Sequence, residues 1–290
     1  MNGLTKSTVG LICCFMVLST GFTQQPSTHT AAQVADNVYI VRGSLANTGF
    51  IVGEEEVLFI DAEMTTDAAK DMLDVMKQET SKPLTKLVLT HSDGDHINGI
   101  AGFPKGLEIY SSAEAKNEMI AEFKAQNRQN LMDYLPTQTF TDKMDIHLGS
   151  ERIQLLHFGP AHTSGDTVVF IPDKKIAFVG DLVFLGMDPL IHRQKGGTSL
   201  GLIKNLQAIL NLDADTFISG HNDVLSRKDV ENVLKDIQGK VDKVRSLIQE
   251  GKSLGEAKEA FGIKEIPAKT GGFSFPSLVE VIYLELTAGK

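Results

Sequence analysis

Residues 87–99 constrain the fold more than any other stretch, because an apolar run typical of a β-strand ends abruptly in a group of imidazoles and carboxylates. Four such side chains lie within six residues: His91, Asp93, Asp95 and His96. Clustered ionisable side chains are not expected in a hydrophobic core. The glycines within and after the group permit the tight backbone that would bring the four side chains together. Nitrogen and oxygen donors without sulfur are typical of zinc, iron or manganese sites. The stretch therefore predicts a metal centre at the end of a strand.

Three residues of the same chemical types follow downstream, each shortly after its own apolar run. They are His162, Asp181 and His221, and a glycine precedes each of them by one to three residues. Four histidines and three aspartates are more ligands than one tetrahedral metal needs. We therefore expect two divalent metal ions that share Asp181.

In the order and spacing of these residues, the chain resembles the metallo-β-lactamase superfamily from about Val38 to about His221. The motif of that family is His-x-His-x-Asp-His, followed by later His, Asp and His ligands. The resemblance implies an α/β fold, the αβ/βα four-layer sandwich, in which two mixed sheets face each other with helices outside and metals at one edge. It also implies that one metal is held by His91, Asp93 and His162, the other by Asp95, His96 and His221, with Asp181 between them.

Position 93 departs from the family motif, because aspartate stands where most members have histidine. Three carboxylates would make a site with two divalent ions and a hydroxide formally neutral, which favours iron or manganese more than the usual motif does. The redox-active flavodiiron branch of the family has a carboxylate at the same place. Alternatively, Asp93 is too short to reach a metal and only the second site is filled.

The resemblance predicts a metal-dependent hydrolase in which a metal-bound hydroxide attacks an amide, ester, lactone or thioester carbonyl, with β-lactams among the candidate substrates. Asp95 would orient the nucleophile in addition to binding a metal. We expect zinc, with iron or manganese as alternatives because of Asp93. The second function considered is a di-iron redox enzyme, against which residues after His221 are typical of helices and not of a flavodoxin-like domain.

The segment 181–197 follows the predicted shared ligand and is basic. His192, Arg193 and Lys195 would bind a carboxylate of a small anionic substrate, and a solvated basic loop is the equally weighted alternative. The formal net charge of −9 argues against nucleic acid as a partner. The oligomeric state is left open.

The first 23 of the 290 residues are typical of an export signal, with a short polar start, an apolar run at 9–18 and small residues at 19–21. The run is too short for a comfortable membrane anchor, so we expect cleavage, a periplasmic or secreted protein and no stable membrane insertion. Cys13 and Cys14 make a lipoprotein a lesser alternative, and the mature chain would have no cysteine. A flexible leader at 24–35 and a catalytic domain at 36–290, helical from about 227, are predicted to follow.

Periodicity predicts the elements around the site. Asp61, at the end of one strand, would either support the metal site or cap a helix. Residues 131–136 would form a flap over the metals or a surface insertion. Strands are predicted at 38–41, 48–52, 57–61, 107–111, 146–148, 151–157, 167–171, 175–178 and 216–218. Helices are predicted at 66–79, 113–130, 199–210, 227–249 and 254–261, with a terminal helix or dimer interface at 273–286.

Overall fold

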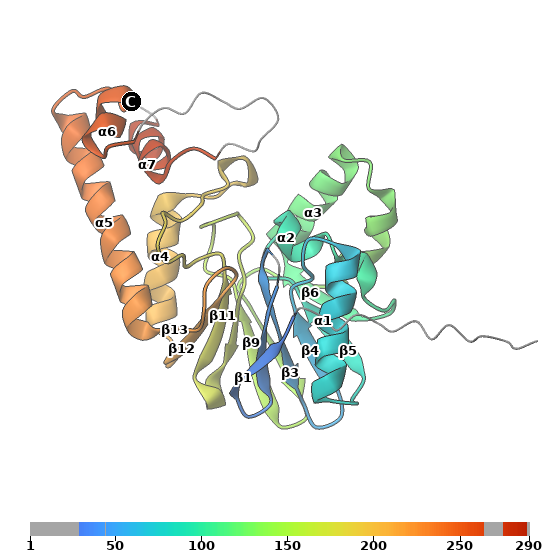
Figure 1. The fold of residues 1–290 in the computed structure, drawn as a ribbon. Helices are drawn as coiled ribbons and strands as arrows, with labels where there is room; N and C mark the ends of the chain where they lie inside the picture. The colour runs from blue at the N-terminus through green and yellow to red at the C-terminus, as the bar shows by residue number, and fades with distance from the viewer. Residues whose placement is uncertain (1–28, 44, 264–274, 289–290) are drawn as a thin grey trace, which may run out of the picture.

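The computed structural model describes residues 29–43, 45–263 and 275–288, and these form two mixed β-sheets packed face to face between layers of helices (Figure 1). In spatial order the first sheet contains β1 (Ala31–Ala35), β2 (Val38–Arg42), β3 (Asn47–Val52), β4 (Val57–Ile60), β5 (Leu84–Val88), β6 (Glu108–Ser112) and β7 (Gln138–Phe140). The second contains β13 (Leu225–Ser226), β12 (Thr216–Ser219), β11 (Ile176–Gly180), β10 (Val168–Ile171), β9 (Glu151–Leu156) and β8 (Lys143–Leu148).

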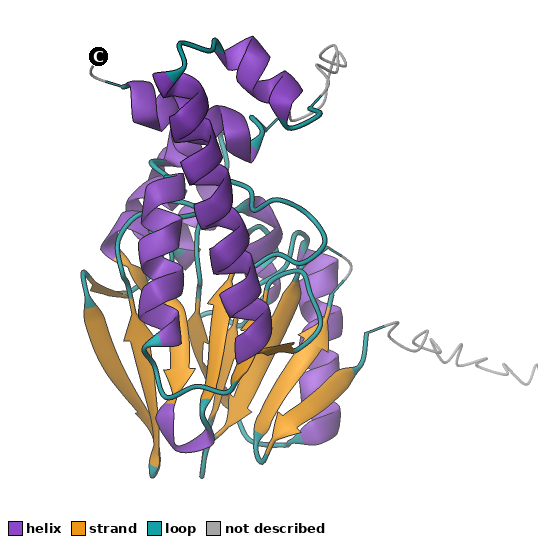
Figure 2. Ribbon diagram, turned by 90° about the vertical axis from the view of Figure 1, so that its left-hand side faces the viewer, coloured by secondary structure: helices purple, strands orange, loops and turns teal. Residues whose placement is uncertain are grey.

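Helices cover the outer face of each sheet. On the first sheet they are α1 (Thr66–Glu79) and α3 (Ala113–Ala125), and on the second α4 (Ser199–Leu210) and α5 (Arg227–Gln249), seen in front in Figure 2. The short helices α6 (Leu254–Ala260) and α7 (Leu278–Thr287) pack together near α5, and α2 (Gly94–Ile97) lies in the loop after β5. Single helical turns occur at η1 (Ile100–Gly102), η2 (Gln129–Tyr134), η3 (Pro172–Lys174) and η4 (Arg193–Lys195). The predicted four-layer sandwich is therefore confirmed.

Strand alternation explains why the sheets have helices on one side and each other on the opposite side. In β4, Val57 and Phe59 pack with residues of α1, whereas Leu58 and Ile60 pack against the second sheet. Consecutive strand side chains point to opposite faces, so an uninterrupted apolar strand is buried on both. Each fully buried large apolar side chain stabilises the fold by roughly 1.5–3 kcal/mol.

The predicted ligands gather at one edge because several strands end there. Strands β4, β5 and β6 are parallel to one another, as are β11 and β12, so their carboxyl ends share an edge in each sheet. Backbone hydrogen bonds join the two sheets near this edge, from Asn47 N to Gly220 O (2.6 Å) and from Thr167 N to Thr90 O (2.7 Å). The site is thus fixed to both sheets.

Two predicted boundaries are wrong. The flexible leader does not extend to residue 35, because Ala31–Ala35 forms β1 and pairs antiparallel with β2. Its small, half-buried side chains give no alternating pattern to detect. The helix expected to reach residue 130 ends at Ala125, since Asn127 adopts a left-handed backbone (φ 55°) that stops a helix.

The predicted export signal at 1–23 lies outside the described residues. Within the part of the chain that the structure describes, no helix is both long and apolar enough to cross a membrane. In the segment 131–136, Leu131 is buried in the same core cluster as residues of α1 and α3, and the choice between a flap and a surface insertion stays a prediction. Of the two alternatives expected at 273–286, the helix is present as α7 (Leu278–Thr287), residues 273–274 lie outside the described residues, and the dimer interface stays a prediction.

Candidate metal centre

The seven predicted metal ligands converge around Asp181, whose side chain is only 3% exposed. Its carboxylate lies 3.0 Å from His221 Nε2, 3.3 Å from His96 Nε2, 3.8 Å from His162 Nε2 and 3.9 Å from His91 Nε2. Residues separated by 130 positions in the sequence are therefore brought to one point. The arrangement places a carboxylate among four imidazoles.

Three overlapping groups in this cluster have ligand atoms close enough to hold a metal ion. In each group these atoms lie within 4.8 Å of one another, and the groups are His91, Asp93 and His162; His91, His96 and Asp181; and Asp95, His96 and His221. The first and third have the same members as the two ligand sets that the resemblance implies. The clusters are consistent with a dinuclear metal site in which Asp181 lies between two ions.

Each of the four histidines is oriented by a hydrogen bond from its Nδ1 to an oxygen of the protein. The acceptors are Thr90 Oγ1 for His91 (3.0 Å), Asp61 Oδ2 for His96 (2.8 Å), Leu190 O for His162 (2.7 Å) and Leu45 O for His221 (2.9 Å). With Nδ1 donating, the lone pair of a neutral imidazole is on Nε2, which in all four faces the cluster. This is the arrangement that metal binding requires.

Several atoms of the cluster are buried without a hydrogen-bond partner in the protein. They include Nε2 of His91, Nε2 of His96 and Oδ1 of Asp181. A buried polar atom left unpaired costs roughly 1–3 kcal/mol, and three of them at one point are costly unless another group satisfies them. A pair of cations fits this donor set.

Charge is distributed unevenly among the side chains of the cluster. Burial and the neighbouring His96 hold the pKa of His91 well below its usual value. Burial also opposes charge on His96 and His162, but Asp181 and Asp61 raise the pKa of His96, and Asp93 raises that of His162 to about 10. Metal ions would thus replace protons that the carboxylates otherwise attract.

Asp61 lies directly behind the ligands, as one of the two alternatives predicted. Its carboxylate accepts hydrogen bonds from Thr90 N (2.7 Å), Thr90 Oγ1 (2.8 Å) and His96 Nδ1. The helix-cap alternative is wrong, because Thr65 caps α1. Asp61 therefore orients His96 directly and His91 through the Thr90 hydroxyl.

A glycine is required beside Asp181, the predicted shared ligand. A Cβ atom at Gly220 would lie 2.2 Å from Asp181 Oδ1 and 2.8 Å from His96 Cε1. Any other residue would push the loop that carries His221 away from the cluster. Steric constraint therefore explains why a glycine precedes His221 after β12.

The basic segment contacts the cluster through two of its three predicted substrate-binding residues. His192 Nε2 lies 3.3 Å from Asp93 Oδ2, and the His192 ring packs on Phe275 with centroids 4.5 Å apart. Lys195 Nζ lies 2.9 Å from Asp93 Oδ1. Arg193 is exposed to solvent. Substrate binding by these residues stays a prediction.

Sequence reasoning missed two glutamates that reach the site from α3. Glu118 accepts hydrogen bonds from Ser92 and Ser164, which flank predicted ligands, and Glu122 Oε2 lies 2.8 Å from Lys195 Nζ. The available signal was their spacing of four residues, which places both on one face of a helix. Nothing in that spacing shows what the face contacts.

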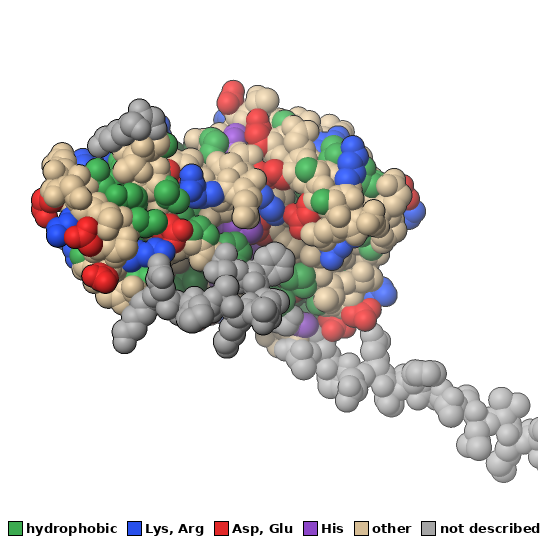
Figure 3. All heavy atoms as spheres, turned by 90° about the horizontal axis from the view of Figure 1, so that it is seen from above, with side chains coloured by type: hydrophobic (Ala, Val, Ile, Leu, Met, Phe, Trp, Pro, Cys, Tyr) green, Lys and Arg blue, Asp and Glu red, His purple; other side chains and the backbone are tan. Residues whose placement is uncertain are grey.

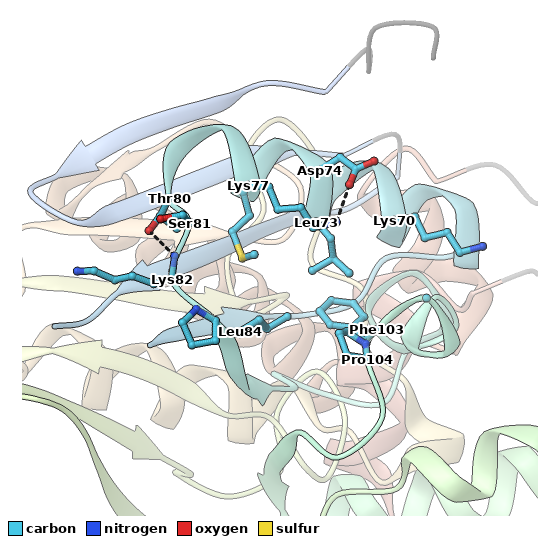
Figure 4. Close-up of a pocket in the computed structure, with 13 residues that line it drawn as sticks. Lys70, Leu73, Asp74, Lys77, Thr80, Ser81, Lys82, Leu84, Phe103 and Pro104 are labelled. Atoms are coloured by element: carbon cyan, nitrogen blue, oxygen red, sulfur yellow. Dashed lines mark hydrogen bonds and ion pairs between the residues drawn. The ribbon is translucent and has the colours of Figure 1, made fainter. Parts of the chain in front are cut away.

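A separate cavity of about 810 Å³ lies beside α1 and contains none of the predicted metal ligands (Figure 4). Its walls combine apolar residues, such as Leu73 and Phe103, with lysines at its rim. Lys77 is paired with Asp74 at 2.8 Å. The cavity is thus distinct from the candidate metal centre.

Two relatives are similar to this chain over part of their own length. The chain is 25% identical over 214 residues to 2,4-dinitroanisole O-demethylase subunit alpha of a Nocardioides species, covering 73% of this chain and 62% of that protein. It is 21% identical over 228 residues to linear primary-alkylsulfatase of a Pseudomonas species, covering 64% of this chain and 43% of that one. The chain thus spans less than two thirds of either relative.

Solved structures share the fold at low sequence identity. The sec-alkylsulfatase Pisa1 from a Pseudomonas species matches 90% of this chain and 51% of its own, with 15% identity and a TM-score of 0.73. A metallo-beta-lactamase from Pontibacter korlensis matches 72% of this chain and 99% of its own, with 19% identity and a TM-score of 0.62. The sequence profile of the metallo-beta-lactamase superfamily matches residues 41–221, which is well over half of the chain and contains all seven clustered residues. The chain belongs to the metallo-beta-lactamase superfamily.

Proposed function

We propose that this protein is a metal-dependent hydrolase that uses two divalent ions to cleave an ester-type bond in a small molecule with an apolar part. One observation carries the proposal: four imidazoles, each held at Nδ1 by the protein, direct Nε2 into a cluster with three carboxylates. One ion would be held by His91, Asp93 and His162, the other by Asp95, His96 and His221, with Asp181 contacting both.

A pair of divalent cations, when bound, supplies a nucleophile from water near neutral pH and stabilises the negative charge that develops on the substrate. The protein's own contribution is to hold the ligands rigidly and to leave one side open. Asp95 and His221 are the accessible members, with side chains 23% and 25% exposed, and Asp95 Oδ2 lies 3.4 Å from His221 Nε2. Asp95 is therefore the carboxylate best placed to accept a proton and to orient a nucleophile on the open side.

The surroundings of the open side favour an apolar substrate group. Phe184, which is buried, stacks on His221 with centroids 5.4 Å apart, whereas Leu45, whose carbonyl binds His221, is 56% exposed. Phe275, which packs on His192, is also exposed. Histidine atoms come to the surface near the middle of the face in Figure 3, with hydrophobic side chains beside them. Such apolar surface would bind an alkyl or aryl group.

The names of the relatives support this substrate class without fixing it. One is named for an alkylsulfatase and another for a demethylase of an aryl methyl ether, so each acts on a small molecule with an alkyl or aryl part. β-Lactams, lactones, amides and thioesters remain candidate substrates for the predicted hydrolase. We also propose export, because residues 1–23 are typical of a signal peptide, and amino-terminal sequencing of the mature protein would test it.

The test combines elemental analysis with a substrate panel. Protein purified without added metal is expected to contain two zinc ions per chain and to hydrolyse alkyl sulfates or aryl and alkyl esters faster than nitrocefin. Hydrolysis of nitrocefin alone would move the proposal to a β-lactamase. Iron with a visible absorption band, and no hydrolysis of any substrate, would replace the hydrolase with the redox alternative.

A further inference from the structure

The two oxygens of Asp93 have different partners. Oδ2 faces the imidazoles, 3.0 Å from His162 Nε2 and 3.9 Å from His91 Nε2. Oδ1 is turned the other way and accepts a hydrogen bond from Lys195 Nζ at 2.9 Å. Only one oxygen of this carboxylate is therefore available to a metal in the first ligand group.

Three oxygens of the protein surround the ammonium group of Lys195. Its ammonium group has three N–H donors. Nζ donates to Asp93 Oδ1 and to the Ser92 carbonyl oxygen (2.9 Å each), and it forms an ion pair with Glu122 Oε2 at 2.8 Å. The side chain is 19% exposed, and these contacts hold the ammonium group between the loop that carries Asp93 and α3.

Helix α3 contacts both loops that carry the first ligand group. Glu122 holds Lys195, and one turn earlier Glu118 accepts hydrogen bonds from the hydroxyls of Ser92 and Ser164 and from Ser164 N (3.0 Å). The backbone of Ser164 also donates to Lys195 O (2.8 Å). Lys195 is thus fixed by contacts of its side chain and of its backbone.

We propose that Lys195, oriented by Glu122, is a positioning residue that fixes Asp93 so that the carboxylate acts as a ligand through one oxygen only. A histidine at this position of the motif offers a single nitrogen, whereas a free carboxylate could rotate or bind through both oxygens. By occupying Oδ1, Lys195 makes the aspartate behave like the imidazole it replaces. The inference rests on the two-metal site of the proposed function, but not on the reaction that the site performs.

The test measures zinc binding by the full chain, so its outcome is independent of whether the substrate class is right. Lys195→Met is expected to weaken one of the two zinc sites by roughly 10- to 100-fold, the usual effect of removing a partner behind a metal ligand, and to leave the other unchanged. Glu122→Gln keeps the shape but loses the ion pair, and should weaken the same site by less. Competition with a chromophoric chelator gives both dissociation constants.

The matched control is Lys124→Met, which removes the same charge from an exposed position on α3, two residues from Glu122. It should leave both zinc affinities unchanged. Loss of zinc in this control would mean that the net charge of the helix, and not the contact with Asp93, sets the affinity. That result would overturn the proposal.

The Asp93→His variant, as a second background, distinguishes an effect of Lys195 on the orientation of Asp93 from a general loss of structure. In Asp93→His the imidazole has no second oxygen to occupy, so adding Lys195→Met there should change zinc affinity by less than about twofold, the limit for independent sites. An equal loss in both backgrounds would overturn the proposal. So would unchanged zinc binding with a raised KM in the single variant, since that pattern would make Lys195 a substrate-binding residue.

Discussion

The two ligand groups of the candidate centre differ in what lies behind them. The group of His91, Asp93 and His162 is buried and braced by charged side chains from α3 and η4. The group of Asp95, His96 and His221 is partly exposed, and His221 is oriented by the carbonyl oxygen of Leu45. From this difference we propose that the first group retains a cation and that the second faces a substrate.

The largest expected effect is the loss of both sites together. Asp181 lies within 4 Å of all four imidazoles, so Asp181→Asn should weaken zinc binding at both groups by more than the roughly 100-fold upper range for a partner behind a ligand. Elemental analysis after gel filtration would show less than one zinc per chain. Asp213→Asn, at an exposed surface ion pair with Lys175, is the control.

Retention of two tightly bound zinc ions by Asp181→Asn would show that the groups are independent. The comparison between them would then concern two separate sites, and the shared carboxylate would have no part in holding them together.

Asp61→Asn should affect the two ligand groups unequally. Its carboxylate contacts His96 directly, but reaches His91 only through the Thr90 hydroxyl. The second group should therefore lose roughly 10- to 100-fold in zinc affinity and the first group less. Spectroscopy of the cobalt-substituted protein would report the two sites separately. Equal loss at both would show that Asp61 supports the whole cluster and not one side of it.

The smallest expected effect tests the substrate-facing side. Leu45→Ser keeps the carbonyl oxygen that binds His221 but removes exposed apolar surface. Zinc content should not change, whereas KM for a long-chain ester should rise about fivefold, equivalent to about 1 kcal/mol of lost apolar contact. A short-chain ester is the internal control. An equal rise for both esters would argue against an apolar substrate group at this position.

Much of the centre could be predicted from the sequence because each ligand follows an apolar strand. A strand end fixes side chains in space, and the order of the seven residues matches a family motif; the structure then brings all seven together. The four-layer architecture followed from the same resemblance. The choice between the two roles of Asp61 depends on the three-dimensional structure, since a carboxylate before a helix is equally suitable as a cap.

The remaining features depend on contacts between distant segments. Lys195 was predicted to bind substrate because it lies in a basic segment, but its partner Glu122 comes from a helix 73 positions earlier in the sequence. No local pattern shows that pairing. Strand β1 was missed for a related reason: its small side chains carry no alternation, and its pairing with β2 defines it.

The most direct test of the account is anomalous diffraction from crystals of the zinc-loaded protein. Two strong peaks are expected, one among His91, Asp93 and His162 and the other among Asp95, His96 and His221, with the Asp181 carboxylate between them. A single peak, or peaks away from these residues, would contradict the account.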